Sequence, residues 1–270
     1  MDGPLAALPD LLRPPLWEWT AGLLGLVVGS FANVCIHRIP RGESVGYPPS
    51  RCPACGAAIR PWDNVPVLSY LLLRGRCRAC RVPISPRYPL VEAANGAAWA
   101  AVAAVYGPTP AAGVAMALVT ALLVLSLIDL DHHLLPNVIT RPGIAAGLAA
   151  SALLPGPPTA LEAALSAAGG YLAFFAVAET YRRTRGVEGL GQGDWKLAAM
   201  LGAFLGWQKM LLTIFVASVA GTLVGGLLIL FAGRDGRHAL PLGTFLGLAG
   251  ILVVLAGDPV LAWYAGFFGG

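Results

Sequence analysis

The chain has 270 residues, of which 57% are hydrophobic and only 12% charged, and its formal net charge is +4. A soluble domain carries about 25% charged residues, so this composition excludes an ordinary soluble globular protein. The 34 glycines and 22 prolines follow no collagen period and form no polar low-complexity tract. The composition therefore predicts an all-α polytopic membrane protein, in which glycines inside apolar runs allow helices to pack closely.

Apolar runs recur along the chain, and we expect about eight transmembrane helices from their length. Short turns such as GPTP at 107–110 separate several of them, because Pro and Gly interrupt helices. The N-terminus lacks the basic region of a signal peptide, so the first helix is expected to be retained. The run at 195–206 is short for a transmembrane helix. The expected helices cover residues 17–37, 89–106, 111–129, 138–154, 160–181, 195–206, 208–231 and 240–257.

The basic residues gather in a few segments. Nine arginines lie between residues 38 and 87, and most of the others lie between later apolar runs. With the N-terminus outside the cell, the segments 38–87, 130–137, 182–194 and 232–239 all face the cytoplasm, as the positive-inside rule requires. The basic segment at 38–87 has no interleaved aromatic residues suited to bases, so nucleic-acid binding is disfavoured.

Four cysteines in this segment form two CxxC pairs, Cys52 with Cys55 and Cys77 with Cys80, and 21 residues separate the pairs. Four thiolates can close a tetrahedron around Zn²⁺, although the spacing lies just beyond the usual range. A cytoplasmic location disfavours disulfides, and a metal can replace the core that so small an insert lacks. We expect a structural, zinc-ribbon-like insert between the first two helices, with free or disulfide-linked cysteines as the alternative. Four thiolates leave no open position for a catalytic zinc.

Two carboxylates lie at predicted cytoplasmic ends of helices. Asp129 closes an apolar run, and Asp194 follows a turn that contains Gly191 and Gly193. Two carboxylates in one site share a proton and can activate a water between a base and an acid. The glycines would let a substrate backbone approach closely. The simpler interpretation, in which Asp194 caps a helix and Asp129 pairs with an arginine, stays open, while Asp131 points elsewhere on a continuing helix.

Sequence blocks along nearly the whole chain resemble the bacterial prepilin peptidases, also called type IV leader peptidases. A lone GxGD would be a weak signal, but the blocks occur together and in the order of the family. The blocks are GSFANVCIHR (29–38), the two CxxC pairs, RPWDNVPVLSYL (60–71), RYPLVE (87–92), IDLDHHLLPN (128–137) and EGLGQGDWKLAAMLG (188–202).

This resemblance implies an intramembrane-type aspartic peptidase of the GxGD kind. Such an enzyme cleaves the short basic leader of type IV prepilins and type II secretion pseudopilins at the cytoplasmic face of the bacterial inner membrane. Asp129 matches the first catalytic aspartate of the family, and Asp194 matches the second. Asn137 stands where the family often has an acid. The chain then divides into residues 1–37 with the first helix, the four-cysteine zinc-binding insert at 38–87 and the peptidase domain at 88–270.

The resemblance also implies that the new N-terminus is methylated with S-adenosylmethionine, an activity associated in the family with the cytoplasmic insert. No residues that bind this methyl donor are indicated, and no oligomeric state is predicted. The expected partners are prepilin or pseudopilin substrates and membrane lipid.

Two alternatives remain. The first is a peptidase without methyl transfer, since no glycine-rich nucleotide loop follows a strand. The second is a transporter or assembly scaffold whose two aspartates bind a cation or protons. The apolar runs at 138–154 and 208–231 contain no acid, which disfavours an ion path.

Overall fold

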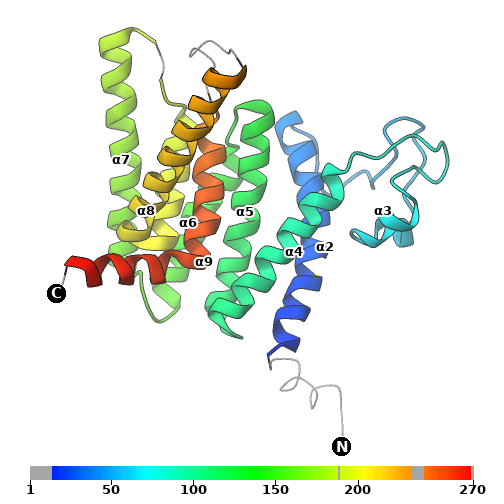
Figure 1. The fold of residues 1–270 in the computed structure, drawn as a ribbon, viewed down its shortest axis with the longest axis horizontal. Coiled ribbons are helices and arrows are strands. Elements are labelled where there is room, and N and C mark those ends of the chain that lie inside the picture. The colour runs from blue at the N-terminus through cyan, green and yellow to red at the C-terminus, as the bar shows by residue number, and fades with distance from the viewer. Residues whose placement is uncertain (1–13, 188, 233–239, 269–270) are drawn as a thin grey trace, which may run out of the picture. The chain divides into compact units, whose positions relative to one another are not determined.

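The computed structural model describes residues 14–187, 189–232 and 240–268 (Figure 1). These residues form helices and no β-strand, with two isolated bridges in the cysteine-containing insert. The predicted all-α class is therefore confirmed. The long helices are α2 (Leu16–Arg38), α4 (Arg87–Tyr106), α5 (Pro110–His132), α6 (Asn137–Leu153), α7 (Ala160–Arg185), α8 (Gln192–Ala232) and α9 (Leu242–Phe268), and the short ones are η1 (Ile39–Arg41), η2 (Pro61–Asn64) and α3 (Leu68–Leu72).

Every predicted apolar run lies in a helix, and five helices are long and apolar enough to cross a membrane. These are α2 with η1, α5, α7, α8 and α9. The element α8 consists of two helices that meet at Gly206, whose backbone is not helical (φ 75°), so the predicted division between the runs at 195–206 and 208–231 is confirmed. The class of multi-pass membrane protein is confirmed.

The chain divides into two compact units, Met1–Thr120 and Ala121–Gly270, which we describe separately. In the first unit, α2 packs closely along α4. A Cβ atom on Gly29 would lie 2.8 Å from the Cα of Glu92, so a larger residue there would separate the two helices. Nearby, the fully buried side chain of Asn95 donates to the carbonyl of Gly25 (2.8 Å) and accepts from Thr120 (2.8 Å). Polar groups buried between these helices thus satisfy one another.

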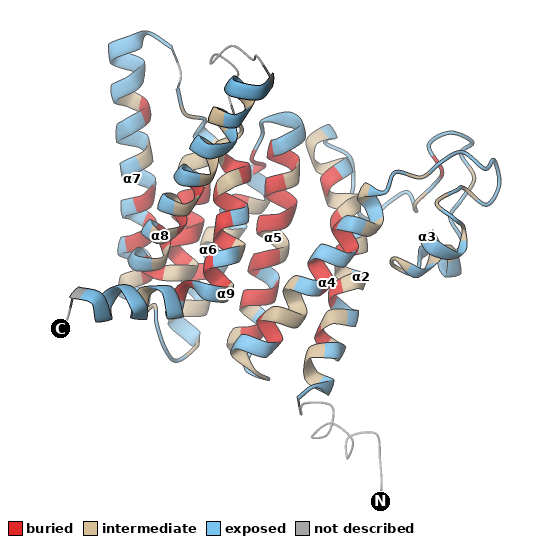
Figure 2. Cartoon of the chain, in the orientation of Figure 1, coloured by how far each residue is buried: buried red, intermediate tan, exposed pale blue. Residues whose placement is uncertain are grey.

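In the second unit, α6, α7 and α9 all contact α8. Within α8, the part before Gly206 is more deeply buried than the part after it (Figure 2). Leu197, Met200 and Leu201 have no exposed surface. The short run at 195–206 is therefore a core helix surrounded by other helices, which explains how so short an apolar segment is accommodated.

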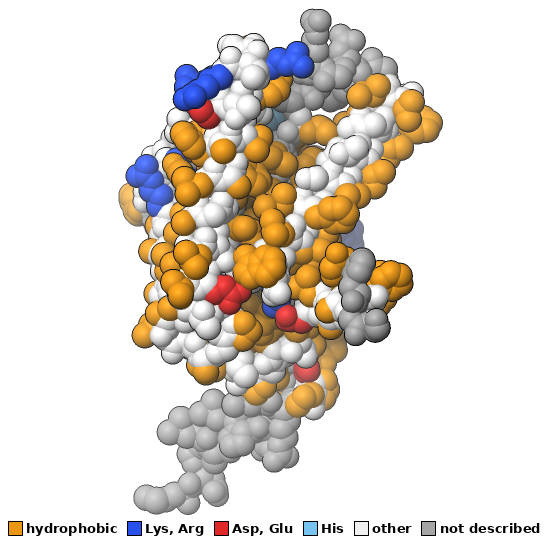
Figure 3. All heavy atoms as spheres, turned by 90° about the vertical axis from the view of Figure 1, so that its left-hand side faces the viewer, with side chains coloured by type: hydrophobic (Ala, Val, Ile, Leu, Met, Phe, Trp, Pro, Cys, Tyr) orange, Lys and Arg blue, Asp and Glu red, His pale blue; other side chains and the backbone are white. Residues whose placement is uncertain are grey.

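The helix α7 shows why the sequence starts and stops helices where it does. Thr159 caps its first turn by accepting from the N–H of Glu162 (3.3 Å), and Gly186, at φ 71°, ends it. Figure 3 shows hydrophobic side chains over most of this face of the molecule, with most of its Lys and Arg side chains toward the upper end. Arg182 and Arg183 lie in the last turn of α7, where they pair with Glu179. An apolar flank with a basic end is typical of a transmembrane helix.

The close approach of α2 and α4 can be tested with Gly29→Ala. The added methyl meets main-chain atoms of Glu92 that cannot move alone, so we expect the free energy of unfolding in detergent to fall by about 1–3 kcal/mol. Gly113→Ala in α5 is the matched control, because a Cβ there meets nothing within 4 Å. Since Ala favours a helix over Gly, the control should be neutral or stabilising by up to about 1 kcal/mol. Equal effects of the two substitutions in thermal unfolding would contradict the close approach.

Candidate functional site

Asp129 lies one turn before the end of α5, and only 5% of its surface is exposed. Its Oδ2 atom accepts from the backbone N–H of Thr244 at 2.7 Å and from the Thr244 hydroxyl at 3.2 Å. The hydroxyl also reaches the carbonyl of Ser126 at 3.1 Å. Thr244 lies in the first turn of α9, where backbone N–H groups have no partner within the helix. The start of α9 thus provides the donors that this buried carboxyl group needs, in place of the arginine of the simpler interpretation.

Asp194 lies in the first turn of α8 and is partly buried. Its Oδ2 atom accepts from the N–H of Gly191 (3.1 Å), and its own N–H donates to the carbonyl of Gly191 (3.1 Å). This is the side-chain half of a capping box, in which an acid at the third position reaches back to the residue before the helix. Asp194 therefore caps the start of α8, as the simpler interpretation predicted.

Both aspartates also belong to one junction of the second unit. A Cβ atom on Gly193 or on Gly243 would lie within 2.8 Å of the side chain of Leu135, and one on Gly243 would lie 2.9 Å from Oδ2 of Asp129. The loop after α5 and the first turns of α8 and α9 therefore meet around Leu135. The carboxyl groups of Asp129 and Asp194 are close enough there to act on one another electrostatically. The two carboxylates singled out in the sequence are thus brought to the same place.

Other groups surround this junction. The Nζ of Lys196 donates to the side-chain oxygen of Asn137 (2.8 Å), which links the start of α8 to the start of α6. The ring of Trp195 packs edge-on against Tyr171 and Phe175 of α7. Asp131, two residues beyond Asp129, is exposed, as expected. These contacts hold the first turn of α8 on its neighbours.

Sequence reasoning missed Thr244. Its contact with Asp129 joins residues 115 positions apart, and no local spacing indicates it. The usable signal was the PLGT segment (241–244) at the start of an apolar run, since a polar residue there lies among free helix N–H groups.

The four cysteines of the insert also converge. The Sγ atoms of Cys52, Cys55, Cys77 and Cys80 all lie within 4.8 Å of one another, and those of Cys52 and Cys80 are 3.8 Å apart. With Zn–S bonds of about 2.3 Å, sulfurs at the corners of a tetrahedron lie about 3.8 Å apart. The cluster therefore has the size and the donor set for a metal ion with four thiolate ligands.

The two CxxC turns share one conformation. Each is closed by an isolated bridge, Arg51 with Ala58 and Arg76 with Pro83. The residue after each second cysteine has a positive φ, 71° at Gly56 and 62° at Arg81. Glycine adopts this conformation freely, whereas Arg81 adopts it at a cost of roughly 1–2 kcal/mol.

Hydrogen bonds within the insert favour a thiolate and fix the second turn. The backbone N–H groups of Cys80 and Ala79 lower the pKa of Cys77 to about 6, and the thiolate is the form that binds metals. Arg78, inside the second CxxC turn, forms a two-pronged ion pair with Asp63 (2.6–3.1 Å), and this pair lowers the pKa of the Asp63 carboxyl. The second turn is thereby attached to η2.

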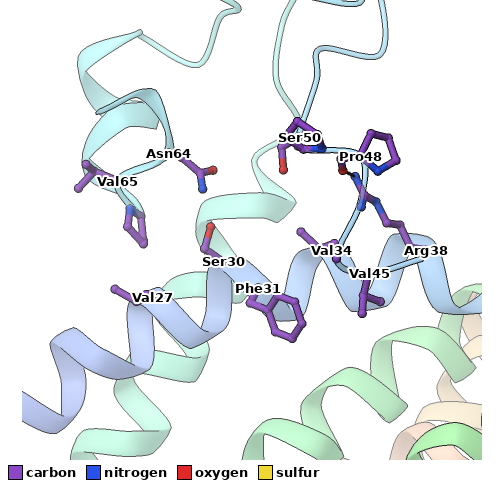
Figure 4. A pocket seen from close by; sticks show the side chains of 13 residues that line it. Val27, Ser30, Phe31, Val34, Arg38, Val45, Pro48, Ser50, Asn64 and Val65 are labelled. Atoms are coloured by element: carbon purple, nitrogen blue, oxygen red, sulfur yellow. Dashed lines mark hydrogen bonds between the residues drawn. The ribbon is translucent and has the colours of Figure 1, made fainter. Parts of the chain in front are cut away.

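A cavity of about 560 Å³ lies in the first unit, between α2 and the insert (Figure 4). Val27, Phe31 and Val34 of α2 supply much of its apolar lining. Its polar lining includes Ser30, Ser50 and Asn64, together with the guanidinium of Arg38, which donates to the carbonyls of Ser44 (3.0 Å) and Pro48 (2.7 Å). The volume lies within the usual range for small-molecule sites, about 300–1,000 Å³.

Comparisons with known proteins agree with these features. Residues 23–106 match the Bacterial Peptidase A24 N-terminal domain, and residues 116–226 match the Type IV leader peptidase family. The chain is 42% identical to a prepilin leader peptidase/N-methyltransferase of Burkholderia pseudomallei, with 95% of this chain and 91% of that protein covered. Proteins of the same name from Pseudomonas aeruginosa (40% identical, 92% and 93% covered) and Aeromonas hydrophila (38%, 90% and 91%) also match. No solved structure gives a significant match.

The backbone of the second CxxC turn can be tested by Arg81→Gly. Because glycine adopts the positive φ without strain, we expect the insert to retain a bound metal more firmly, with about 3- to 10-fold slower release to a chelator. The reciprocal variant Gly56→Ala should release metal faster than the unmodified chain. The measurement is the rate at which a colorimetric chelator takes up metal from detergent-purified protein. Unchanged rates in both variants would show that these φ angles do not affect the site.

Proposed function

Because the chain belongs to the type IV leader peptidase family, we propose that it cleaves the short basic leader of type IV prepilins and type II secretion pseudopilins, with Asp129 and Asp194 as the catalytic pair. One observation carries the proposal, namely that the loop after α5 and the first turns of α8 and α9 meet around Leu135 and bring both carboxyl groups to one site. We expect the reaction at the cytoplasmic face of the bacterial inner membrane, within the predicted peptidase domain at 88–270.

The hydrogen bonds indicate how the pair works. Thr244 donates to Oδ2 of Asp129, and the N–H of Gly191 donates to Oδ2 of Asp194. Neither donor bonds to the Oδ1 atom of these carboxyl groups. A water between the two carboxyl groups gives a proton to the ionised one as its oxygen attacks the scissile carbonyl carbon. The protonated one then supplies a proton to the leaving amine as the C–N bond breaks. The reaction needs no metal and no covalent intermediate.

The turn at Gly191 and Gly193 is where we expect the substrate backbone to approach. Gly191 is exposed, and the nearest group to a Cβ there would be Oδ2 of Asp194, at 3.4 Å. A side chain at Gly191 would therefore lie between the substrate and the carboxylate. Gly193 has a second reason to be glycine, because it packs against Leu135.

Methyl transfer is the second activity in the proposal, supported by the names of the relatives. S-adenosylmethionine, when bound, supplies a methyl group attached to a positively charged sulfur. The chain itself must bind this donor and admit the new N-terminus of the substrate. The cavity beside α2 is large enough for such a donor and has polar and apolar walls.

The cysteine cluster is proposed to hold a structural zinc ion. Four thiolates satisfy its tetrahedral preference, so the ion would stabilise the insert and would not bind substrate. Between Ile39 and Pro86, the described residues include one buried hydrophobic side chain, Cys52. An insert with so little apolar core depends on another source of stability, which a metal supplies.

The catalytic pair is tested with a prepilin and S-adenosylmethionine, using mass spectrometry to follow leader loss and methyl addition. Asp129→Asn and Asp194→Asn should each lower the cleavage rate by roughly 100- to 10,000-fold, because an amide cannot exchange the proton. Asp131→Asn is the matched control, since Asp131 is exposed on the same turn, and it should cleave normally.

Each outcome of this experiment has a distinct meaning. Cleavage at the normal rate in either catalytic variant would remove that aspartate from the mechanism. Leader loss by the unmodified chain without added methyl mass would leave a peptidase alone. Failure to cleave any of a panel of prepilins and pseudopilins would overturn the proposed function.

Zinc is tested by elemental analysis of protein purified without added metal. We expect about one zinc per chain, from one set of four cysteines. Cys52→Ser should lower the zinc content and make the insert more sensitive to proteolysis, whereas Cys35→Ser, outside the cluster, should change neither. Metal-free protein with a protease-resistant insert would disprove the structural zinc site.

A further inference from the structure

Two of the sequence blocks supply residues to the lining of the cavity in Figure 4, and a third holds one of its walls in place. The block at 29–38 supplies Ser30, Phe31, Val34 and Arg38 to its lining, and the block at 60–71 supplies Asn64, Val65 and Pro66. The third block, 87–92, contributes Glu92, whose Oε2 accepts from the N–H of Val67 at 2.7 Å, next to the wall formed by 64–66. Segments from α2, the insert and α4 are thus organised around one space.

We propose that this cavity is the binding site of the methyl donor, S-adenosylmethionine. The inference rests on the methyl transfer proposed above and assigns that activity a place in the first unit.

The polar lining matches the chemistry of this donor. The side chains of Ser30, Ser50 and Asn64 point into the space between α2 and the insert (Figure 4). An amide offers both a donor and an acceptor to the edge of an adenine, and hydroxyls suit a ribose. The ring of Phe31 is the aromatic group in the lining, available for contact with a base.

Charge supports the same assignment. The guanidinium of Arg38 has five N–H groups and uses one on each terminal nitrogen to bind the carbonyls of Ser44 and Pro48. The remaining N–H groups can bind the carboxylate of the donor. Glu92 does not line the cavity, because its Oε2 accepts from the N–H of Val67 behind the wall. Arg38 is therefore the charged group of the lining, and it suits the carboxylate end of the donor.

The backbone around Glu92 shows that the wall of the cavity is held in place. Val67 has a φ of 59°, which is uncommon for a β-branched residue, and the N–H of Val67 is the group that Glu92 accepts from. The carboxylate therefore fixes the position of the preceding residues, Val65 and Pro66, that line the cavity. A strained turn held by a buried acid is typical of a preorganised binding site.

The test is equilibrium dialysis of radiolabelled S-adenosylmethionine against the full-length protein in detergent. Ser50→Trp, which fills the cavity, should weaken binding at least 10-fold, and Asn64→Ala, which removes one polar partner, about 3- to 10-fold. Leu72→Trp in α3 is the matched control, since Leu72 belongs to the same insert, is 75% exposed and does not line the cavity. Leader cleavage and zinc content, measured in parallel, should be unchanged in all three variants.

The outcomes separate this inference from the proposed function. Wild-type affinity in both cavity variants, equal weakening by Leu72→Trp, or no binding by the unmodified chain would each overturn the assignment. In each case leader cleavage would still decide the peptidase independently. If the unmodified chain binds the donor and the cavity variants do not, the assignment stands even where no prepilin is cleaved.

Discussion

A carboxyl group buried near the end of an apolar helix must find hydrogen-bond donors, and the second unit is organised around this requirement. Asp129 obtains its donors from the first turn of α9, where N–H groups are free because no earlier turn exists. That solution demands that α9 begin beside α5, and Gly243 permits the approach. The carboxyl group of Asp194 obtains its donor from the turn before α8, where the N–H of Gly191 binds it. Each carboxyl group is thus bound at one oxygen by a helix start, which leaves the other oxygen for chemistry.

Much of this architecture could be predicted from the sequence, because apolar periodicity and breaks at Pro and Gly are local signals. The helices α2, α4, α5, α6 and α7 begin and end within a few residues of the predicted runs. The resemblance to leader peptidases is confirmed, because its specific blocks span the chain. The convergence of the two CxxC pairs was also predicted from their spacing, since four thiolates can surround one metal ion.

Other features depend on contacts between distant segments. The PLGT segment marks the start of α9, but nothing in the sequence indicates that Asp129 is the partner of Thr244. The run at 195–206 likewise gave no sign that it would contact α6, α7 and α9. The role of Asp194 as a helix cap does not conflict with the proposed role as half of a pair, because the capping bond from Gly191 uses Oδ2 alone.

The insert is stabilised by different interactions from those of the helical bundle. Its described residues bury almost no apolar surface, so its shape depends on polar links: the cysteine cluster, the Asp63–Arg78 pair, the bonds from Arg38 to the 44–48 loop, and the bond from Val67 to Glu92. Several of these links anchor the same loops that line the cavity beside α2. Loss of the metal would therefore loosen the cavity as well as the CxxC turns. A structural ion would then affect methyl transfer through the cavity, whereas the donors that hold the aspartate pair belong to helix starts within the second unit.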